Sequence, residues 1–95
     1  MRSRYSAYVR GDTAYVRATW HSTTRPPAPE LAPDPATRWL GLEVRRTEGG
    51  GVADGAGVVE FVARLKRNGR AERLHEVSRF VREQGRWYYV DGRAP

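Results

Sequence analysis

Apolar and polar residues recur along the chain with two different periods, and the change of period separates a helical first part from a strand-rich second part. The first part predicts two short helices, Arg2 to Arg10 and Thr13 to Trp20, divided by Gly11-Asp12. Gly11 can adopt the left-handed conformation that ends a helix, and Asp12 can cap the amides that open the next one. We therefore expect two helices joined by a tight turn.

The apolar residues of the first predicted helix share one face. Met1, Tyr5, Tyr8 and Val9 are spaced at i, i+4, i+7 and i+8, which forms one stripe at 3.6 residues per turn. We expect this stripe to pack inward and the arginines of the helix, Arg4 among them, to lie away from it. The second helix is apolar on most sides, so the pattern does not decide which of its faces points inward.

A proline-rich loop follows the helices. Five of the six prolines fall between Pro26 and Pro35, where they remove amide donors and oppose regular pairing. At its end, Asp34-Pro35-Ala36-Thr37 combines a capping residue with a proline at the first helical position, which predicts one helical turn.

From Trp39 onward the period is two, which is typical of strands. A glycine-rich loop over 49–57 and the turns Asn68-Gly69 and Gln84-Gly85 divide this part into four segments. The predicted strands are Trp39 to Arg45, Val58 to Lys66, Arg70 to Arg82 and Arg86 to Asp91. Helices followed by an antiparallel meander predict an α+β fold in which the helices cover one face of the sheet.

A two-residue turn at Asn68-Gly69 sets the faces of the long hairpin. It places Phe61 opposite Glu76 and Arg64 opposite Arg73. The apolar face then holds Val59, Phe61, Ala63, Leu65, Leu74 and Phe80. Glu76 and Ser78 share that face, in the middle of the strand. A buried carboxylate needs a partner, and we expect Glu76 to pair with Arg4 or Arg79.

The turn at Gln84-Gly85 leaves two registers open. A two-residue turn places Tyr89 opposite Phe80 and Asp91 opposite Ser78, on the apolar face. A three-residue turn with a bulge at Gly85 would move Trp87, Tyr89 and Asp91 to the other face. We favour the two-residue turn.

The opposite face of the hairpin carries charged side chains, with the basic surface Arg64, Arg73 and Arg79 among them. The 95-residue chain has 17 basic and 11 acidic side chains and a net charge of +6, and all but Lys66 of the basic residues are arginine. Clustered cations would favour phosphates, but net charge constrains function weakly. We favour scattered, solvated arginines over a nucleic-acid surface.

Residue types exclude several kinds of site. The chain has no cysteine, which removes disulfides, thiolate metal sites and thiol nucleophiles. His21 and His75 are far apart in sequence and predict no metal site, since the ligand spacing is missing. We expect a cap or loop role for His21, an exposed position for His75, and no cofactor. With 39% apolar residues, no signal peptide and no membrane-spanning run, we expect one cytoplasmic domain over residues 1–95.

Six separated motifs resemble one known family. They are Met1-Arg2-Ser3-Arg4-Tyr5, Thr19-Trp20-His21, Trp39-Leu40-Gly41-Leu42, Phe61-Val62-Ala63-Arg64, Glu76 with Ser78-Arg79-Phe80, and Trp87-Tyr88-Tyr89-Val90-Asp91-Gly92. In this order they resemble the YchJ-like family of bacterial proteins. The resemblance implies the nuclear transport factor 2-like (NTF2-like) fold, a cone of curved antiparallel sheet and helices. Members commonly carry flanking cysteine-rich zinc segments of the SecA C-terminus type, and this sequence contains none.

The implied cone suggests a pocket between sheet and helices. Its expected lining is Tyr5, Trp20, Phe61, Glu76, Ser78, Phe80, Tyr89 and Asp91. Our first hypothesis is a binding module without catalysis, for an unknown small molecule or protein, with a homodimer through the outer sheet face. The alternative is an isomerase-like or hydrolase-like enzyme that uses Glu76 or Asp91 as its base. Nucleic-acid binding is the least favoured hypothesis.

Overall fold

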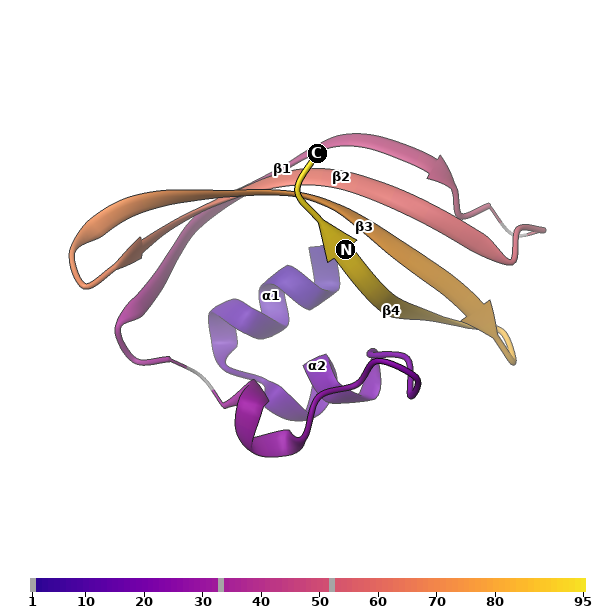
Figure 1. The fold of residues 1–95 in the computed structure, drawn as a ribbon, viewed down its shortest axis with the longest axis horizontal. Helices are drawn as coiled ribbons and strands as arrows, with labels where there is room; N and C mark the ends of the chain where they lie inside the picture. Colours follow the sequence, from indigo (N-terminus) through magenta and orange to yellow (C-terminus); the bar gives the residue numbers. More distant parts are fainter. Residues whose placement is uncertain (1, 33, 52) are drawn as a thin grey trace.

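A curved antiparallel sheet arches over two short helices, which cover its concave face (Figure 1). The computed structural model describes residues 2–32, 34–51 and 53–95. The sheet is a meander with the strand order β1-β2-β3-β4. The elements are α1 (Arg2–Arg10), α2 (Thr13–Ala18), the 3₁₀ turn η1 (Ala28–Leu31), β1 (Thr37–Gly49), β2 (Ala56–Arg67), β3 (Arg70–Glu83) and β4 (Arg86–Arg93). None of these described helices has the length and apolar character of a membrane span.

The junction between the helices forms as predicted. Gly11 is left-handed at φ +68°, and the Asp12 carboxylate accepts a hydrogen bond from the Tyr15 amide at 3.1 Å. α2 ends two residues earlier than expected because the chain then pairs with the edge of β4. The His21 amide donates to the Tyr89 carbonyl at 2.7 Å, and the Tyr89 amide donates to the Thr19 carbonyl at 2.8 Å. We call residues 19–21 the bridge segment.

The inward face of α1 differs from the prediction. Arg4 and Ala7 are the buried residues of this helix, at 5% and 0% exposure, whereas Val9 is 52% exposed. Met1 lies outside the described residues. Tyr5 is half-buried with its ring edge-on against Trp39, at 5.9 Å between ring centres. The prediction that Arg4 lies away from the core is therefore wrong.

The end of the proline-rich loop is a turn rather than a helical turn. The Ala36 amide donates to the Asp34 carboxylate at 2.9 Å, and the Thr37 amide donates to the Asp34 carbonyl at 3.0 Å. The bond from the Ala36 amide, and after it one from the Thr37 hydroxyl, lower the pKa of the Asp34 carboxyl below its ordinary value. β1 begins directly after them, at Thr37.

Both predicted hairpin turns are confirmed. The four turn residues Asn68, Gly69, Gln84 and Gly85 have φ between 52° and 78°, as a type I′ turn requires. The register of β2 and β3 is the predicted one, with Phe61 opposite Glu76 and Arg64 opposite Arg73. Leu74 lies on the predicted face but is 41% exposed, because this hairpin extends past the helices (Figure 1).

A bulge in β4 changes the faces of its last residues. Phe80 pairs with Tyr89 as predicted, but the next pairs are Arg79 with Asp91 and Ser78 with Gly92. One extra residue, Val90, therefore lies between the two registers. The predicted pairing of Asp91 with Ser78 is wrong, and Asp91 lies on the outer face.

The buried apolar residues come from both faces of the sheet. Ala7, Val16, Phe61, Ala63, Leu65 and Phe80 form the core between helices and sheet. Val62 and Val77, at 2% and 7% exposure, have the parity of the outer face, where Glu60 and His75 lie beside them. Long polar side chains thus cover two valines on the outer face.

Candidate functional site

Arg4 occupies the middle of the concave face. α1 carries its side chain toward the end of α2, where Nη1 donates to the Val16 carbonyl at 3.0 Å and to the Thr19 hydroxyl at 2.6 Å. The guanidinium carbon lies 4.6 Å from the centre of the Tyr89 ring and 5.2 Å from that of Trp20. Such cation–π contacts stabilise a desolvated cation by up to about 2 kcal/mol.

The charge of Arg4 has no carboxylate partner among the described residues. Within the ranges 2–32, 34–51 and 53–95, no Asp or Glu oxygen forms an ion pair with this guanidinium. Burial lowers the pKa of Arg4, and the nearby phenols of Tyr8 and Tyr89 offset part of that effect. A buried arginine stays charged, and an anion beside it would therefore stabilise it.

Aromatic rings surround the guanidinium and hold each other in place. Tyr89 packs edge-on against Trp20 at 4.8 Å and against Phe80 at 5.7 Å between ring centres. The bridge segment fixes this arrangement, because the His21 amide donates to the Tyr89 carbonyl and the Thr19 carbonyl accepts from the Tyr89 amide. Burial raises the pKa of Tyr89 to about 12, and the negative charge of Glu76 adds to that rise.

Glu76 faces the concave side, as predicted, but pairs with neither expected arginine. Its carboxylate accepts a hydrogen bond from the Ser78 hydroxyl at 2.8 Å. It also lies directly over Gly92, where a Cβ atom would come within 2.2 Å of its carboxyl carbon. Ser78 is completely buried at 0% exposure. The two predicted polar residues therefore meet, with Gly92 providing the space.

Because of the bulge in β4, Asp91 does not lie beside Glu76 and Ser78, as was predicted, but on the outer face. Its two carboxylate oxygens accept hydrogen bonds from Nε and Nη2 of Arg79, at 2.7 and 2.6 Å. This ion pair lowers the pKa of Asp91 and raises that of Arg79. Because Asp91 lies on the outer face, the expectation that it lines the concave pocket is wrong.

A cavity of about 720 Å³ opens between the helices and the end of the sheet where β1 ends and β4 begins. We call it the end cavity. The helices contribute Ser3, Arg4, Tyr15 and Ala18, and the bridge segment contributes Thr19. The sheet side contributes Thr47 to Gly50, Gly57 to Val59, Phe80, and Arg86 to Tyr88. Of the eight predicted pocket residues, only Phe80 lines it. The space expected for the pocket is filled by Arg4 and the rings around it.

A second cavity, of about 880 Å³, lies at the other end of α1, next to the junction of the helices and the start of β1. Its walls include Tyr8, Trp20 and Trp39, together with residues of the proline-rich loop. Trp20, a predicted pocket residue, lines this second cavity, whereas Tyr5, Phe61, Glu76, Ser78, Tyr89 and Asp91 line neither of the two.

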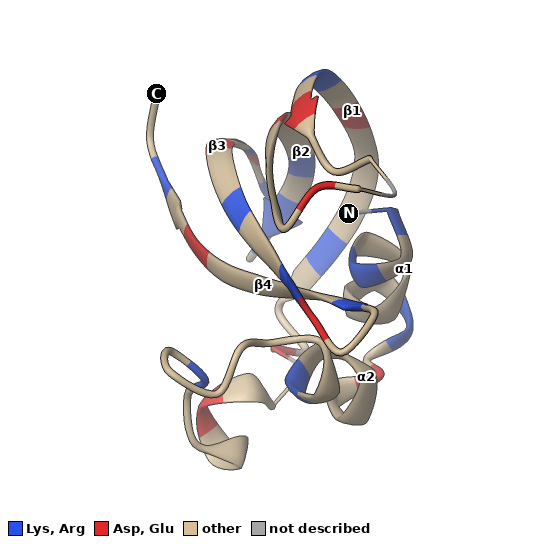
Figure 2. Ribbon diagram, turned by 90° about the vertical axis from the view of Figure 1, so that its right-hand side faces the viewer, with Lys and Arg blue, Asp and Glu red and all other residues tan. Residues whose placement is uncertain are grey.

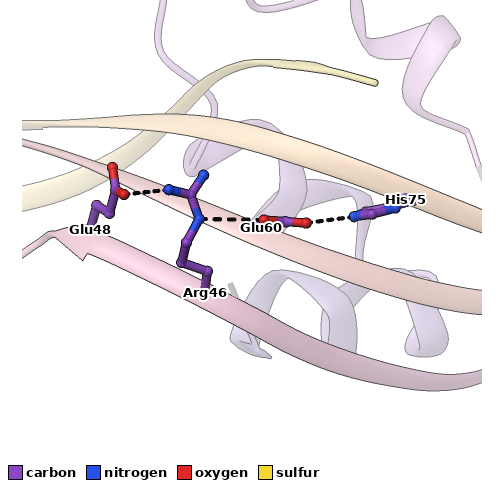
Figure 3. Close-up of polar contacts among 4 residues, drawn as sticks. All are labelled: Arg46, Glu48, Glu60 and His75. Carbon is purple, nitrogen blue, oxygen red and sulfur yellow. Dashed lines mark hydrogen bonds and ion pairs between the residues drawn. The ribbon is translucent and has the colours of Figure 1, made fainter. Parts of the chain in front are cut away.

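The outer face carries a charged row across three strands (Figure 3). Arg46 on β1 binds both Glu48 and Glu60, and Glu60 accepts a hydrogen bond from His75 at 2.7 Å. The hydrogen bond from His75, and after it the contacts with Arg46, lower the pKa of Glu60. His75 is therefore engaged on the sheet surface, rather than simply exposed as predicted.

Of the predicted basic surface, Arg79 is bound to Asp91, which leaves Arg64 and Arg73 exposed side by side. Basic positions occur on α1, α2 and the strands, whereas acidic positions occur on the strands, on η1 and between the elements, and none lies on α1 or α2 (Figure 2). The described residues bring no three His, Cys, Asp or Glu side chains together as a metal site. His21, predicted in a cap or loop role, lies in the bridge segment and pairs with Glu83 at 2.8 Å.

Comparison with known proteins identifies the family. The model of the YchJ middle NTF2-like domain matches residues 1–92. This chain belongs to the YchJ family. The α+β fold with helices on a four-stranded antiparallel sheet is accordingly NTF2-like.

Relatives of the YchJ domain are similar over almost the whole chain. A UPF0225 protein from Chromobacterium violaceum is 60% identical over 93 residues, covering 97% of this chain and 69% of its own length. A UPF0225 protein from Methylibium petroleiphilum is also 60% identical, with 65% of its own length covered. The chain thus spans about two thirds of the length of these relatives.

Two solved structures share the fold. The solution structure of a SEC-C motif containing protein from Rhodopseudomonas palustris matches all of this chain and 75% of its own, at 33% identity and a TM-score of 0.86. The crystal structure of a SEC-C motif containing protein from Psychrobacter arcticus matches at 28% identity and a TM-score of 0.75, with 56% of its chain covered.

The most informative site residue, Arg4, was missed by the helical pattern. The pattern counted arginine as polar and placed it outward. The available signal was the group of aromatic residues at Tyr8, Trp20 and Tyr89, whose ring faces can accommodate a guanidinium.

Proposed function

We propose that this YchJ domain is a small-ligand-binding module without catalysis and that its site is the end cavity. The observation that carries the proposal is the cavity itself, about 720 Å³ between the helices and the sheet. This size lies within the range of small-molecule sites, which are apolar with a few polar groups. Here the apolar wall includes Val59, Phe80 and Trp87, and the polar groups include Arg4 and Thr19.

The positions of the two acidic residues favour binding over catalysis. Asp91 is held by Arg79 on the outer face, and Glu76 is bonded to Ser78 beside Gly92. Neither residue is among those that line the end cavity. The hypothesis of an enzyme with either carboxylate as base at this cavity therefore loses its geometric support.

The test is a thermal-shift screen of the protein against a small-molecule library. A ligand present at 100 times its Kd stabilises the folded state by about 2.7 kcal/mol. For a domain of this size that corresponds to a rise of roughly 10 °C or more in Tm. We expect at least one chemical class to produce such a rise.

Two matched variants decide whether the ligand occupies the end cavity. Ala18→Trp fills the cavity from the last residue of α2, whereas Ala14→Trp adds the same group to an exposed position of α2 outside it. We expect Ala18→Trp to abolish the ligand-induced rise and Ala14→Trp to retain it. A library without effect on the wild-type protein, or equal responses from both variants, would reject this site.

A further inference from the structure

The end cavity contains a cation whose counter-ion is missing from the described chain. Arg4 is 5% exposed and is part of the cavity wall. Nη1 donates the hydrogen bonds to Val16 and Thr19, and these acceptors are neutral. Since no described carboxylate forms an ion pair with Arg4, its guanidinium can form one with an anionic group that enters the cavity.

A second arginine of the same chain shows which contact Arg4 lacks. Arg79 presents its Nε and Nη2 edge to Asp91 and binds both carboxylate oxygens, at 2.7 and 2.6 Å. This two-bond geometry is the preferred one between guanidinium and carboxylate. Both hydrogen bonds of Arg4 to Val16 and Thr19 come from the other edge, at Nη1.

The atoms of Arg4 are not sealed inside the protein. Among the described residues, every completely buried side-chain nitrogen and oxygen has a hydrogen-bond partner. The Tyr8 phenol is a further neutral partner of the guanidinium, and Arg4, which keeps 5% of its surface exposed, is part of the wall of the end cavity.

The other charges of the cavity wall leave it positive. Arg86 is the second cation, and Glu48 is the acidic residue of the wall. Glu48 is already bound to Arg46 on β1. The field inside the cavity therefore favours an anion over a neutral or cationic molecule.

Apolar groups form another part of the wall. Ala18 lies on the helical side, and Val59, Phe80 and Trp87 lie on the sheet side. These groups suit a hydrocarbon or aryl body next to the charged group, because burial of apolar surface supplies binding free energy.

We propose that the ligand of the end cavity is an amphipathic organic carboxylate, whose carboxylate binds Arg4 and whose apolar body contacts Val59, Phe80 and Trp87. This inference rests on the proposed function and adds the chemical class of the ligand. It assigns Arg4 as the residue that recognises the anionic group.

Matched pairs of probes test the class. We would titrate 2-naphthoate and decanoate against the purified protein by calorimetry, each beside its neutral analogue, 2-naphthamide or decanamide. We expect at least one carboxylate to bind about tenfold or more tightly than its amide, the ratio that corresponds to about 1.4 kcal/mol. Equal binding of carboxylates and amides would overturn the inference while the proposed cavity stands.

Variants then assign the preference to Arg4. Arg4→Met removes the charge from the cavity, and Arg17→Met removes a charge from an exposed position of α2 that does not line it. We expect Arg4→Met to lose the preference for the carboxylate and keep the affinity for the amide, and Arg17→Met to resemble the wild type. A preference that survives in folded Arg4→Met would overturn the assignment.

A measurement on the wild-type protein covers the case in which Arg4→Met does not fold. In a ¹⁵N spectrum of labelled arginine side chains, the Nε–H signal of Arg4 should move on addition of the carboxylate and not of the amide. An unchanged Arg4 signal in the presence of a bound carboxylate would contradict the inference. No binding by any probe, together with a negative library screen, would reject the proposed function itself.

Discussion

Gly92 and Glu76 share one small volume on the concave face. A Cβ atom on residue 92 would come within 2.2 Å of the Glu76 carboxyl carbon and 2.3 Å of one of its oxygens. The carboxylate can occupy this position because glycine leaves it empty, and from there it accepts the hydrogen bond from Ser78. Gly92 is therefore a packing requirement and not a matter of backbone flexibility.

We predict that Gly92→Ala destabilises the fold by about 1 to 2 kcal/mol, because the added methyl group displaces Glu76 from Ser78. In a Glu76→Ala background the same substitution should cost close to nothing. Chemical denaturation of the two single variants and the double variant measures this coupling. Gly41→Ala is the control, since a Cβ atom there meets no atom within 4 Å. Additive effects in the cycle would contradict the explanation.

Ionisation of the Tyr89 phenol makes the stability of the fold depend on pH in the alkaline range. Its pKa is raised to about 12 in the folded protein, whereas an unfolded chain ionises tyrosine near pH 10. As the pH rises from about 10 toward about 12, the unfolded state loses this proton first, so the folded state loses stability. The neutral phenol is thus a condition for burial beside Glu76.

We predict that Tyr89→Phe makes stability less sensitive to pH in this window, because phenylalanine keeps the ring contacts and has no proton to lose. Urea midpoints at about pH 9 and about pH 11.5 test it, with the wild type losing more between the two values. Tyr5→Phe, against Trp39, serves as the control. Parallel losses in wild type and Tyr89→Phe would show that Tyr89 does not carry this effect.

At the level of elements, local turn chemistry predicted most of the sheet. Asn68-Gly69 and Gln84-Gly85 predict two-residue turns, and the register of β2 with β3 follows from the first of them over its whole length. The bulge at Val90 has no such signal, because an inserted residue in a strand needs no glycine or proline. The face of Asp91 could therefore not be predicted from the alternation alone.

The candidate site was less predictable than the sheet. The concave face of Phe80, Tyr89 and Glu76 follows from parity, but the location of a cavity depends on which long side chain fills the space. Arg4 reaches across from α1 and occupies the centre, so the cavity lies at the end of the sheet. Tertiary packing decides such a placement, and a single-helix pattern does not contain it.

Strands β1, β2 and β3 are connected across the outer face by Arg46, Glu60 and His75 (Figure 3). The lowered pKa of Glu60 means that its ionised form contributes stability above the ordinary glutamate pKa, and this contribution is lost as the pH falls through the folded value. Ionised Glu60 thus stabilises the fold at neutral pH, and this stabilisation is lost at acidic pH.

We predict that the stability difference between wild type and Glu60→Gln shrinks as the pH falls from about 5 to about 3, where the carboxyl group of the wild type becomes protonated. Denaturant midpoints at three pH values measure it. Asp91→Asn removes the other lowered carboxyl pKa of this face and should show the same trend. A constant difference for Glu60→Gln over this range would be evidence against the network.

For the whole molecule, the net charge of +6 is spread over helices and sheet (Figure 2). Arg79, one of the three arginines of the predicted basic surface, is neutralised by Asp91. Adjacent Arg64 and Arg73 remain, with Lys66 and Arg38 paired beside them at the same end of the sheet, which is still a small footprint for a phosphate backbone. The homodimer through the outer face stays a prediction, and light scattering in solution tests it.

We predict no retention of a short single-stranded RNA or a DNA duplex in a gel-shift assay at about 50 mM salt. The physical reason is the small size of the group of adjacent cations on the outer face and the pairing of Arg79 with Asp91. A shift that weakens steeply at higher salt and is lost in an Arg64→Ala, Arg73→Ala double variant would instead support the nucleic-acid hypothesis.

The bridge segment has a consequence for self-association. β4 is the last strand of the sheet, and its outer backbone groups at Tyr89 would otherwise be free to template another chain. Residues 19–21 occupy those groups, and the Thr24 hydroxyl caps the Val90 carbonyl at 2.5 Å. The bridge segment thereby prevents the strand of another molecule from pairing with β4 at Tyr89, as would occur in amyloid-like stacking, independently of any ligand.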